Sequence, residues 1–223
     1  MQENRNLTAY RQQLYDRILD TAMSAFTKKG IKAVKMDDIA QQLVISKRTL
    51  YEIFENKEVL LYEGVRKSKR QRNELLKQMV SECSNVMDLI LLFYHKKVEE
   101  FKLVNPQFYE DLVRYPRVLD FLEEEKDANH QQFMAFLMRG VSEGYFRSDI
   151  DYEVVTWSFS IMSQNIMSSQ LYNKYSMEYI MYNLIFVSLR GFCTQKGIEV
   201  LDGFMKTLEI SNINKINMDL KTV

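Results

Sequence analysis

Apolar residues recur every three or four positions along almost the whole chain, and no stretch alternates for long between apolar and polar residues. The first pattern is the period of an amphipathic helix, whereas alternation would indicate a strand. The sequence therefore predicts an all-α fold. A first helix carries the stripe Leu14, Ile18, Ala22 and Phe26 and ends at Gly30. Three further helices are expected at 36–43, 46–53 and 57 to about 81–85.

The rest of the chain is also predicted to be helical. Seven Gly and two Pro in 223 residues are too few for many turns or sheets. Pro106 and Pro116 each suit the first turn of a helix, where a missing N–H costs nothing, and Gly197 is the expected end of the last long helix. The predicted ranges are 86–104, 117–143, 152–170 and 177–196, and weak periodicity predicts a loosely held tail at 210–223.

Charge is divided unevenly along the chain although the net charge is zero. Residues 1–72 contain 15 Lys and Arg against 9 Asp and Glu, a balance of +6, and residues 73–223 contain 15 against 21, a balance of −6. This asymmetry favours a basic binding surface in the N-terminal part. A chance imbalance of solvated faces is the alternative reading.

The remaining bulk features indicate a protein of the cytoplasm. Cys83 and Cys193 are too few for a disulfide scaffold and fit a reducing compartment. The chain opens on polar residues without a signal peptide. The longest apolar run, 89–94, is far below the roughly 20 residues that a membrane span requires.

The segment 36–54 has the pattern of a helix-turn-helix. Ala40 supplies the small residue that two crossing helices need. The apolar positions that bury the two helices against each other are Ile39, Leu43, Ile45, Leu50 and Ile53. Ser46 is a plausible N-cap of the second helix, and polar residues follow it where a recognition helix reaches the major groove. The pattern indicates binding to double-stranded DNA.

Residues 11 to about 65 resemble the DNA-binding domain of the TetR/AcrR family of one-component regulators. The shared features are Ile18-Leu19-Asp20-Thr21-Ala22, Phe26, Gly30, Asp38-Ile39-Ala40, Ser46-x-x-Thr49-Leu50-Tyr51-x-x-Phe54 and Asn56-Lys57-Glu58-x-Leu60. The resemblance implies an N-terminal three-helix DNA-binding domain at 8–62, with its helix-turn-helix at about 36–54. A larger helical domain for effector binding and dimerisation would follow at 63–209.

Contact roles follow from the resemblance position by position. Lys47, Arg48 and Thr49 match base- and phosphate-contacting positions, Tyr51 matches the tyrosine that leans on the sugar–phosphate backbone, and Lys57 matches a phosphate-holding lysine. The full set of expected DNA contacts is Lys35, Ser46, Lys47, Arg48, Thr49, Tyr51 and Lys57. Most such contacts position the protein, and few of them read bases.

Two positions depart from the family pattern. Lys35 stands where the family usually has a capping Thr; a lysine cannot cap the helix, although it could bind phosphate. Val44 stands where the family usually has Gly in the turn. Because a β-branched residue disfavours positive φ, we expect a slightly reshaped turn.

The C-terminal helices carry two further expectations. Two of them are apolar on two faces and so need two packing partners, one of which can be a second copy of the chain. A central position of both helices in a monomer is the alternative. The expected interface residues are Val154, Ile161, Ile180, Leu184 and Val187. An adaptable apolar cavity for an unknown small effector is expected from Phe101, Phe108, Phe133, Met134, Met138 and Trp157. For each of these six residues, ordinary core packing is the alternative.

Enzymatic activity has no support in the sequence. His95 and His130 are solitary and lack metal-ligand spacing. There is no glycine-rich phosphate loop and no nucleophile motif, so no cofactor or metal is expected. The sequence predicts a ligand-responsive transcriptional regulator, more readily a repressor, that binds a palindromic operator as a homodimer. The alternative is a helical protein-interaction module that has lost DNA binding.

Overall fold

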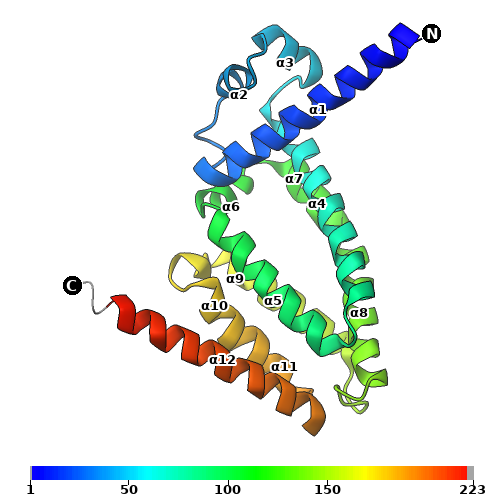
Figure 1. Cartoon of the computed structure of the whole chain (residues 1–223), viewed down its shortest axis with the longest axis vertical. Coiled ribbons are helices and arrows are strands. Elements are labelled where there is room, and N and C mark those ends of the chain that lie inside the picture. The colour runs from blue at the N-terminus through cyan, green and yellow to red at the C-terminus, as the bar shows by residue number, and fades with distance from the viewer. Residues whose placement is uncertain (1, 220–223) are drawn as a thin grey trace. The chain divides into compact units, whose positions relative to one another are not determined.

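The computed structural model describes the backbone of residues 2–219 (Figure 1). It describes the side chains of residues 10–125 and 129–208. Its elements are α1 (Gln2–Lys29), α2 (Met36–Leu43), α3 (Lys47–Ile53), α4 (Lys57–Glu82), α5 (Val86–Leu103), α6 (Gln107–Leu112), α7 (Pro116–Glu124), α8 (Lys126–Ser142), α9 (Tyr152–Ser168), η1 (Leu171–Asn173), α10 (Met177–Ile180), η2 (Met181–Phe186), α11 (Val187–Gly191) and α12 (Gln195–Asp219). No strand occurs in this described part, which confirms the predicted all-α fold.

Helix α1 ends, and helices α2 to α5 begin and end, within a few residues of the predicted limits, and local chemistry explains several of these ends. Gly30 closes α1 with a φ of 83°, and its N–H donates to the carbonyl of Phe26 over 2.9 Å. Ser46 caps α3, because its hydroxyl accepts the N–H of Thr49 at 3.0 Å. These ends depend on neighbouring residues, so the sequence predicted them well.

Two predicted helices are wrong in extent. The helix expected at 117–143 is divided at Glu125 into α7 and α8. The helix expected at 177–196 contains a π-helical turn, η2, and breaks at residues 192–194. Gly197 therefore lies inside α12 rather than at a helix end. A Cβ at Gly197 would stand 2.3 Å from the carbonyl oxygen of Tyr145, so a close tertiary approach explains this glycine.

The predicted tail at 210–223 lies outside the residues whose side chains are described. Its backbone continues α12 as far as Asp219. Within the described residues, no helix has the length and apolarity that crossing a membrane would require.

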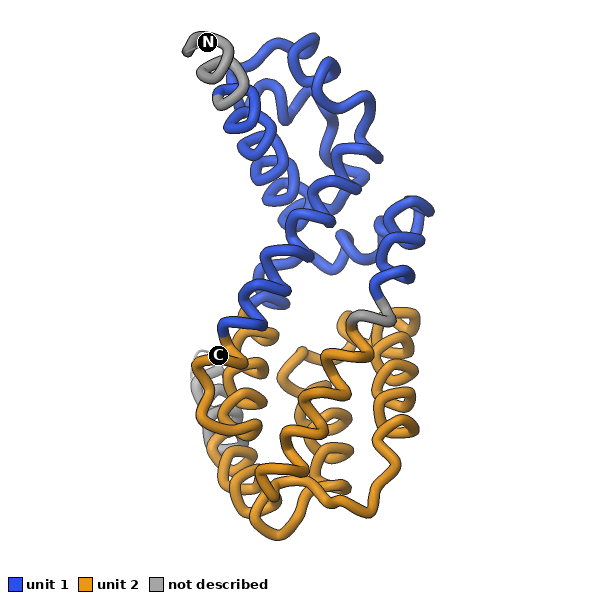
Figure 2. Tube along the Cα trace, turned by 90° about the vertical axis from the view of Figure 1, so that its right-hand side faces the viewer, with its two compact units in different colours: residues 1–78, 100–126 blue, residues 79–99, 127–223 orange. Residues whose placement is uncertain are grey.

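The chain forms two compact units (Figure 2). Unit 1 contains residues 1–78 and 100–126, and unit 2 contains residues 79–99 and 127–223. Helices α4 and α5 each run from one unit into the other. The predicted domain limits, 8–62 and 63–209, follow chain order and stay a prediction. The compact units do not follow chain order, because α6 and α7 pack with the first four helices.

A single apolar core holds unit 1 together. Ile18, Phe26, Leu50 and Leu60 have no exposed surface, and Val118 of α7 is equally buried among them. Burial of such side chains contributes about 1.5–3 kcal/mol each to the free energy of folding. The helix-turn-helix is therefore fastened to a scaffold that includes α6 and α7.

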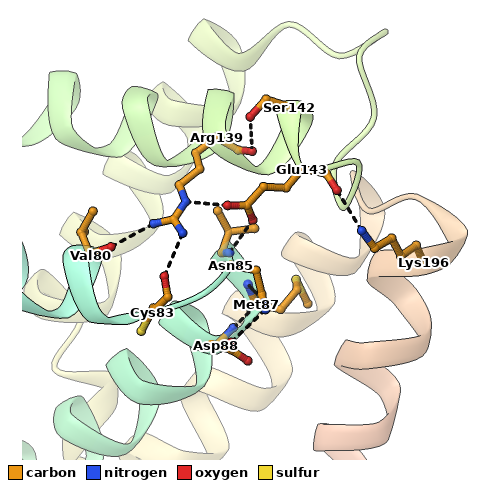
Figure 3. Close-up of polar contacts among 10 residues, drawn as sticks. Val80, Cys83, Asn85, Met87, Asp88, Arg139, Ser142, Glu143 and Lys196 are labelled. Carbon is orange, nitrogen blue, oxygen red and sulfur yellow. Dashed lines mark hydrogen bonds and ion pairs between the residues drawn. The ribbon is translucent and has the colours of Figure 1, made fainter.

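Unit 2 has its own apolar core, which is rich in aromatic residues. Hydrogen bonds from Arg139 and Glu143 hold the corner between α4 and α5 (Figure 3). Arg139 of α8 donates to the carbonyls of Val80 and Cys83 at 3.1 and 2.9 Å, and to Glu143 at 2.6 Å. Glu143 also accepts the N–H of Val86 at 2.7 Å. A cation thus meets the carbonyl end of α4 and an anion meets the amide end of α5, as the helix dipoles favour.

Candidate nucleic-acid interface

The helix-turn-helix is built by the close crossing of α2 and α3. Ala40 is 2% exposed at the crossing, and its carbonyl accepts the N–H of Ile45 at 3.0 Å. Ile39 and Leu50 are fully buried beside it. Leu43, Ile45 and Ile53 pack against the same core while partly exposed. The apolar positions predicted from the sequence therefore anchor both helices.

The outer side of α3 carries the polar residues that the sequence singled out. Lys47 and Arg48 have exposed side-chain fractions of 68% and 88%. Tyr51 is 47% exposed, one turn further along the same helix. The first turn of α3 and its cap at Ser46 thus meet the solvent, as contact with DNA requires.

Each basic residue at the start of α3 is held by a carboxylate. The ammonium of Lys47 lies 2.5 Å from Asp37 of α2, and the guanidinium of Arg48 lies 2.8 Å from Glu52. The hydrogen bond to Asp37 raises the pKa of Lys47 above its usual value. Exposed pairs of this kind are weak, so phosphates can replace the carboxylates. The sequence analysis missed both acids, although Arg48 and Glu52 have the i,i+4 spacing of a helical ion pair.

Lys57 has a second role beside the one that the resemblance implies. Its ammonium donates to the carbonyl of Val34 at 2.6 Å and to that of Lys32 at 3.4 Å. Burial lowers the pKa of Lys57, and the carboxylates of Asp111 and Asp38 oppose that shift. Since an ammonium has three N–H bonds, one remains for a phosphate. Lys57 joins the start of α4 to the α1–α2 turn.

The two departures from the family pattern have different outcomes. Lys35 gives α2 no side-chain cap, as predicted; instead its backbone N–H donates to Asp38 at 2.9 Å. The expected reshaping of the turn at Val44 is wrong. Val44 takes the left-handed conformation that suits glycine, with φ 56° and ψ 43°, and is 91% exposed. The surrounding helix packing imposes the turn on a residue that disfavours it.

Comparison with known proteins agrees with this geometry. The sequence model of the family described as bacterial regulatory proteins, tetR family, matches residues 18–63, which span the end of α1 to the start of α4. The chain therefore contains, at residues 18–63, a domain similar to the DNA-binding domain of TetR-family regulators. It is therefore a DNA-binding transcriptional regulator and not an enzyme.

Relatives extend the likeness beyond the family model. The transcriptional repressor KstR2 of Mycobacterium tuberculosis is 25% identical over 144 residues, which are 62% of this chain and 72% of that protein. A TetR-family regulator from Marinobacter aquaeolei has a TM-score of 0.67 at 15% identity, over 87% of this chain and 98% of that one. A transcriptional regulator from Saccharomonospora viridis, solved in complex with choline, has a TM-score of 0.64 at 18% identity, over 82% and 100%. The solved structures show that the fold is shared.

Helix α9 has an exposed apolar stripe in unit 2. Val154, Trp157 and Ile161 are 58%, 67% and 37% exposed, at spacings of three and four residues. Val187 of α11 is 54% exposed, whereas Ile180 is 2% exposed and Leu184 is half-buried. The interface expectation needs correction at Ile180, which is buried within its own chain.

The six residues expected to line one effector cavity are not brought together. Phe108 lies in the core of unit 1, and Phe101 stacks on Tyr109 in the same unit, with ring centroids 5.4 Å apart. In unit 2, Phe133 packs against Phe159 at 5.4 Å, and Trp157 points outward. Met134 and Met138 line a surface depression of about 370 Å³. Helical periodicity could not separate these environments. No group of His, Cys, Asp and Glu within the described residues is arranged to hold a metal.

Proposed function

We propose that this chain is a ligand-responsive repressor of the cytoplasm that binds a palindromic operator as a homodimer. The observation that supports the dimer is the exposed stripe of Val154, Trp157 and Ile161 on α9. Large exposed apolar side chains in one row usually mark an interaction surface. A second copy presents the same row, so the contact is self-complementary about a two-fold axis.

Dimerisation explains how a short recognition helix achieves specificity. Each α3 would enter one major groove, and two grooves on the same side of the duplex are about 34–36 Å apart. The operator would then be roughly palindromic. The name of the KstR2 relatives supports repression as the sign of regulation.

Ligand response is the finer part of the proposal. The effector would be a small, largely apolar molecule bound among the helices of the second domain. The Saccharomonospora viridis protein, solved in complex with choline, supports binding of a small ligand. An effector that favours a spacing of the two α3 helices that does not fit DNA would weaken DNA binding. A coupling free energy of only about 1–3 kcal/mol would lower the affinity for DNA 5–150-fold.

The dimer is tested with Trp157→Lys, which places a charge in the centre of the stripe. We expect sedimentation equilibrium to show a dimer for the parent and a monomer for the variant, because a buried unpaired ammonium is strongly unfavourable. Ser163→Lys adds the same charge at an exposed α9 position outside the stripe and should remain dimeric. A parent that sediments as a monomer would contradict the proposed dimer.

DNA docking is tested with the double variant Tyr51→Ala plus Lys57→Ala. Genomic fragments selected by the parent serve as probes in a gel shift at several salt concentrations. We expect the double variant to weaken binding to every fragment, since both residues are assigned to the sugar–phosphate backbone. The alternative, an interaction module without DNA binding, predicts that the parent shows no salt-dependent shift.

A further inference from the structure

Asp111 of α6 is the one charged side chain that is buried among the described residues, with 1% of its surface exposed. It lies outside the segment matched by the family model. A carboxylate remains ionised away from water only where donors and cations compensate it. Its surroundings therefore indicate what it does.

The donors around Asp111 come from α6 and from the α1–α2 connection. One carboxylate oxygen accepts the backbone N–H of Lys32 at 2.6 Å. The other accepts the side-chain amide of Gln107 at 3.2 Å. Asp111 thus fixes the backbone of a turn that lies 79 residues earlier in the chain.

The cation that faces this turn is the ammonium of Lys57. It contacts the carbonyl of Lys32, whose N–H is bound to Asp111, and it bonds more closely to the carbonyl of Val34. The backbone at Lys32 is therefore held between the carboxylate and the ammonium. The negative charge of Asp111 acts against the lowering of the Lys57 pKa that burial causes.

Helix α6 packs closely against the end of α1, and this packing fixes the position of Asp111. A Cβ on Gly30 would stand 2.7 Å from Cγ of Gln107 and 3.1 Å from Oδ2 of Asp111, so α6 lies directly on the glycine. The backbone N–H of Asn105 donates to the carbonyl of Thr27 at 2.7 Å. These contacts leave Asp111 little freedom to move.

We infer that Asp111 is a positioning residue for DNA binding, which acts from α6 on the α1–α2 turn and on Lys57. It holds the ammonium so that its remaining N–H bond meets a phosphate. The inference rests on the proposed docking of Lys57 on the sugar–phosphate backbone. It extends the DNA-binding apparatus to a helix that follows α4 and α5 in the chain.

The inference predicts an effect of unusual sign. Removing a negative charge from a DNA-binding unit ordinarily strengthens binding, because the protein field becomes more positive. Asp111→Asn should instead weaken binding about tenfold, on the order of one charge-assisted phosphate contact. Asp120→Asn, at an exposed position of α7 in the same unit, makes the same chemical change and should bind as well as the parent or slightly better.

The experiment measures fluorescence anisotropy of a genomic duplex selected by the parent, over a range of salt. The proteins are the parent, Asp111→Asn, Asp120→Asn, Lys57→Ala and the double variant Asp111→Asn plus Lys57→Ala. We expect the logarithmic salt slope to fall by about 0.9 in Asp111→Asn, the value for one lost phosphate contact. We expect the double variant to bind no more weakly than Lys57→Ala, because Asp111 acts through Lys57.

Two results distinguish a role of Asp111 in positioning Lys57 from a role in stabilising the fold alone. If Asp111→Asn weakens binding equally in the presence and absence of Lys57, the inference is overturned. If Asp111→Asn binds like Asp120→Asn, it is overturned as well. A parent that binds no duplex would instead overturn the proposed docking, on which the inference rests.

Asparagine keeps an acceptor for the N–H of Lys32, and circular dichroism checks that the variant is folded. Gln107→Ala supplies a second variant, since it frees one carboxylate oxygen while keeping the buried charge. We expect it to weaken binding in the same direction by about threefold. Parent-like binding by Gln107→Ala together with an unfolded Asp111→Asn would overturn the inference.

Discussion

The two compact units expose surfaces of opposite chemistry. In unit 1 the start of α3 presents Lys47 and Arg48, each already paired with a carboxylate. In unit 2 the exposed face of α9 presents Val154 and Trp157. The carboxylates neutralise the two exposed cations until another anion, such as a phosphate, displaces them, whereas covering the apolar row with another surface lowers the free energy.

The interiors of the two units differ as well. The junction of α6 with the rest of unit 1 combines the buried ring of Phe108 with the hydrogen bonds of the buried Asp111. The core of unit 2 depends on rings in close contact, where Phe146 and Phe192 lie 5.2 Å apart. Substitutions in unit 2 should therefore change stability first, and substitutions on the surface of unit 1 should change DNA binding first.

The largest effect is expected from Gly140→Ala in unit 2. A Cβ there would stand 2.0 Å from the buried ring of Phe146, which packs against the rings of Phe136 and Phe192. We expect the free energy of unfolding in urea to fall by about 3 kcal/mol, the upper range for overpacking. Gly203→Ala on α12 is the control, since nothing lies within 4 Å of its Cβ position; it should be neutral or slightly stabilising.

A smaller effect is expected from Arg48→Ala, which changes the surface of unit 1. The variant should shift the preference among operator sequences by about tenfold at one base pair, because Arg48 is assigned to base contact. Selection of bound fragments from a random library measures this preference. Arg70→Ala removes the same charge from α4 and should leave the preference unchanged; an identical selected sequence for parent and Arg48→Ala would contradict the assignment.

Val44→Gly should stabilise the protein slightly. Glycine adopts the φ of 56° without strain, and the valine side chain, at 91% exposed, loses no packing. We expect the free energy of unfolding to rise by about 1 kcal/mol, part of the strain being offset by the greater freedom of glycine in the unfolded chain. Thermal unfolding is measured for Val44→Gly and Val44→Ala in parallel, because alanine removes the β-branch but keeps the strain of the left-handed conformation. A glycine variant that is less stable than the parent would contradict this explanation.

The smallest effect is expected from Asp37→Asn. The substitution releases Lys47, a proposed DNA contact, from its ion pair and removes the negative charge beside it. DNA affinity should rise about threefold at low salt and return to the parent value at high salt, since both effects are electrostatic. Equal affinities at every salt concentration would show that the pair does not compete with phosphate.

Sequence reasoning succeeded where the cause is local. The cap at Ser46, the end of α1 at Gly30 and the buried positions Ile39 and Leu50 all follow from residues within a few positions of one another. The family resemblance added contact roles for the outward side chains of α3. Those roles stay predictions, although the exposure of Lys47, Arg48 and Tyr51 is what they require.

Sequence reasoning failed where distant segments decide the outcome. Trp157 was assigned to a cavity and Ile180 to an interface, but Trp157 is 67% exposed and Ile180 is 2% exposed. Both lie on helices that are apolar on two sides, and periodicity alone cannot tell which side meets the protein's own core. Gly197 was read as a helix end, whereas its lack of a side chain admits the carbonyl of Tyr145.

The sequence by itself determined that this chain is helical, that its N-terminal part contains a helix-turn-helix and that it resembles TetR-family regulators, because helix period, caps and a short motif are local properties. Only the tertiary structure decided that α6 and α7 join the first unit, that Asp111 is buried against the turn before α2 and that α9 turns its tryptophan outward. Those outcomes depend on contacts between segments many residues apart, and the free energy of such contacts is not visible in any single stretch of sequence.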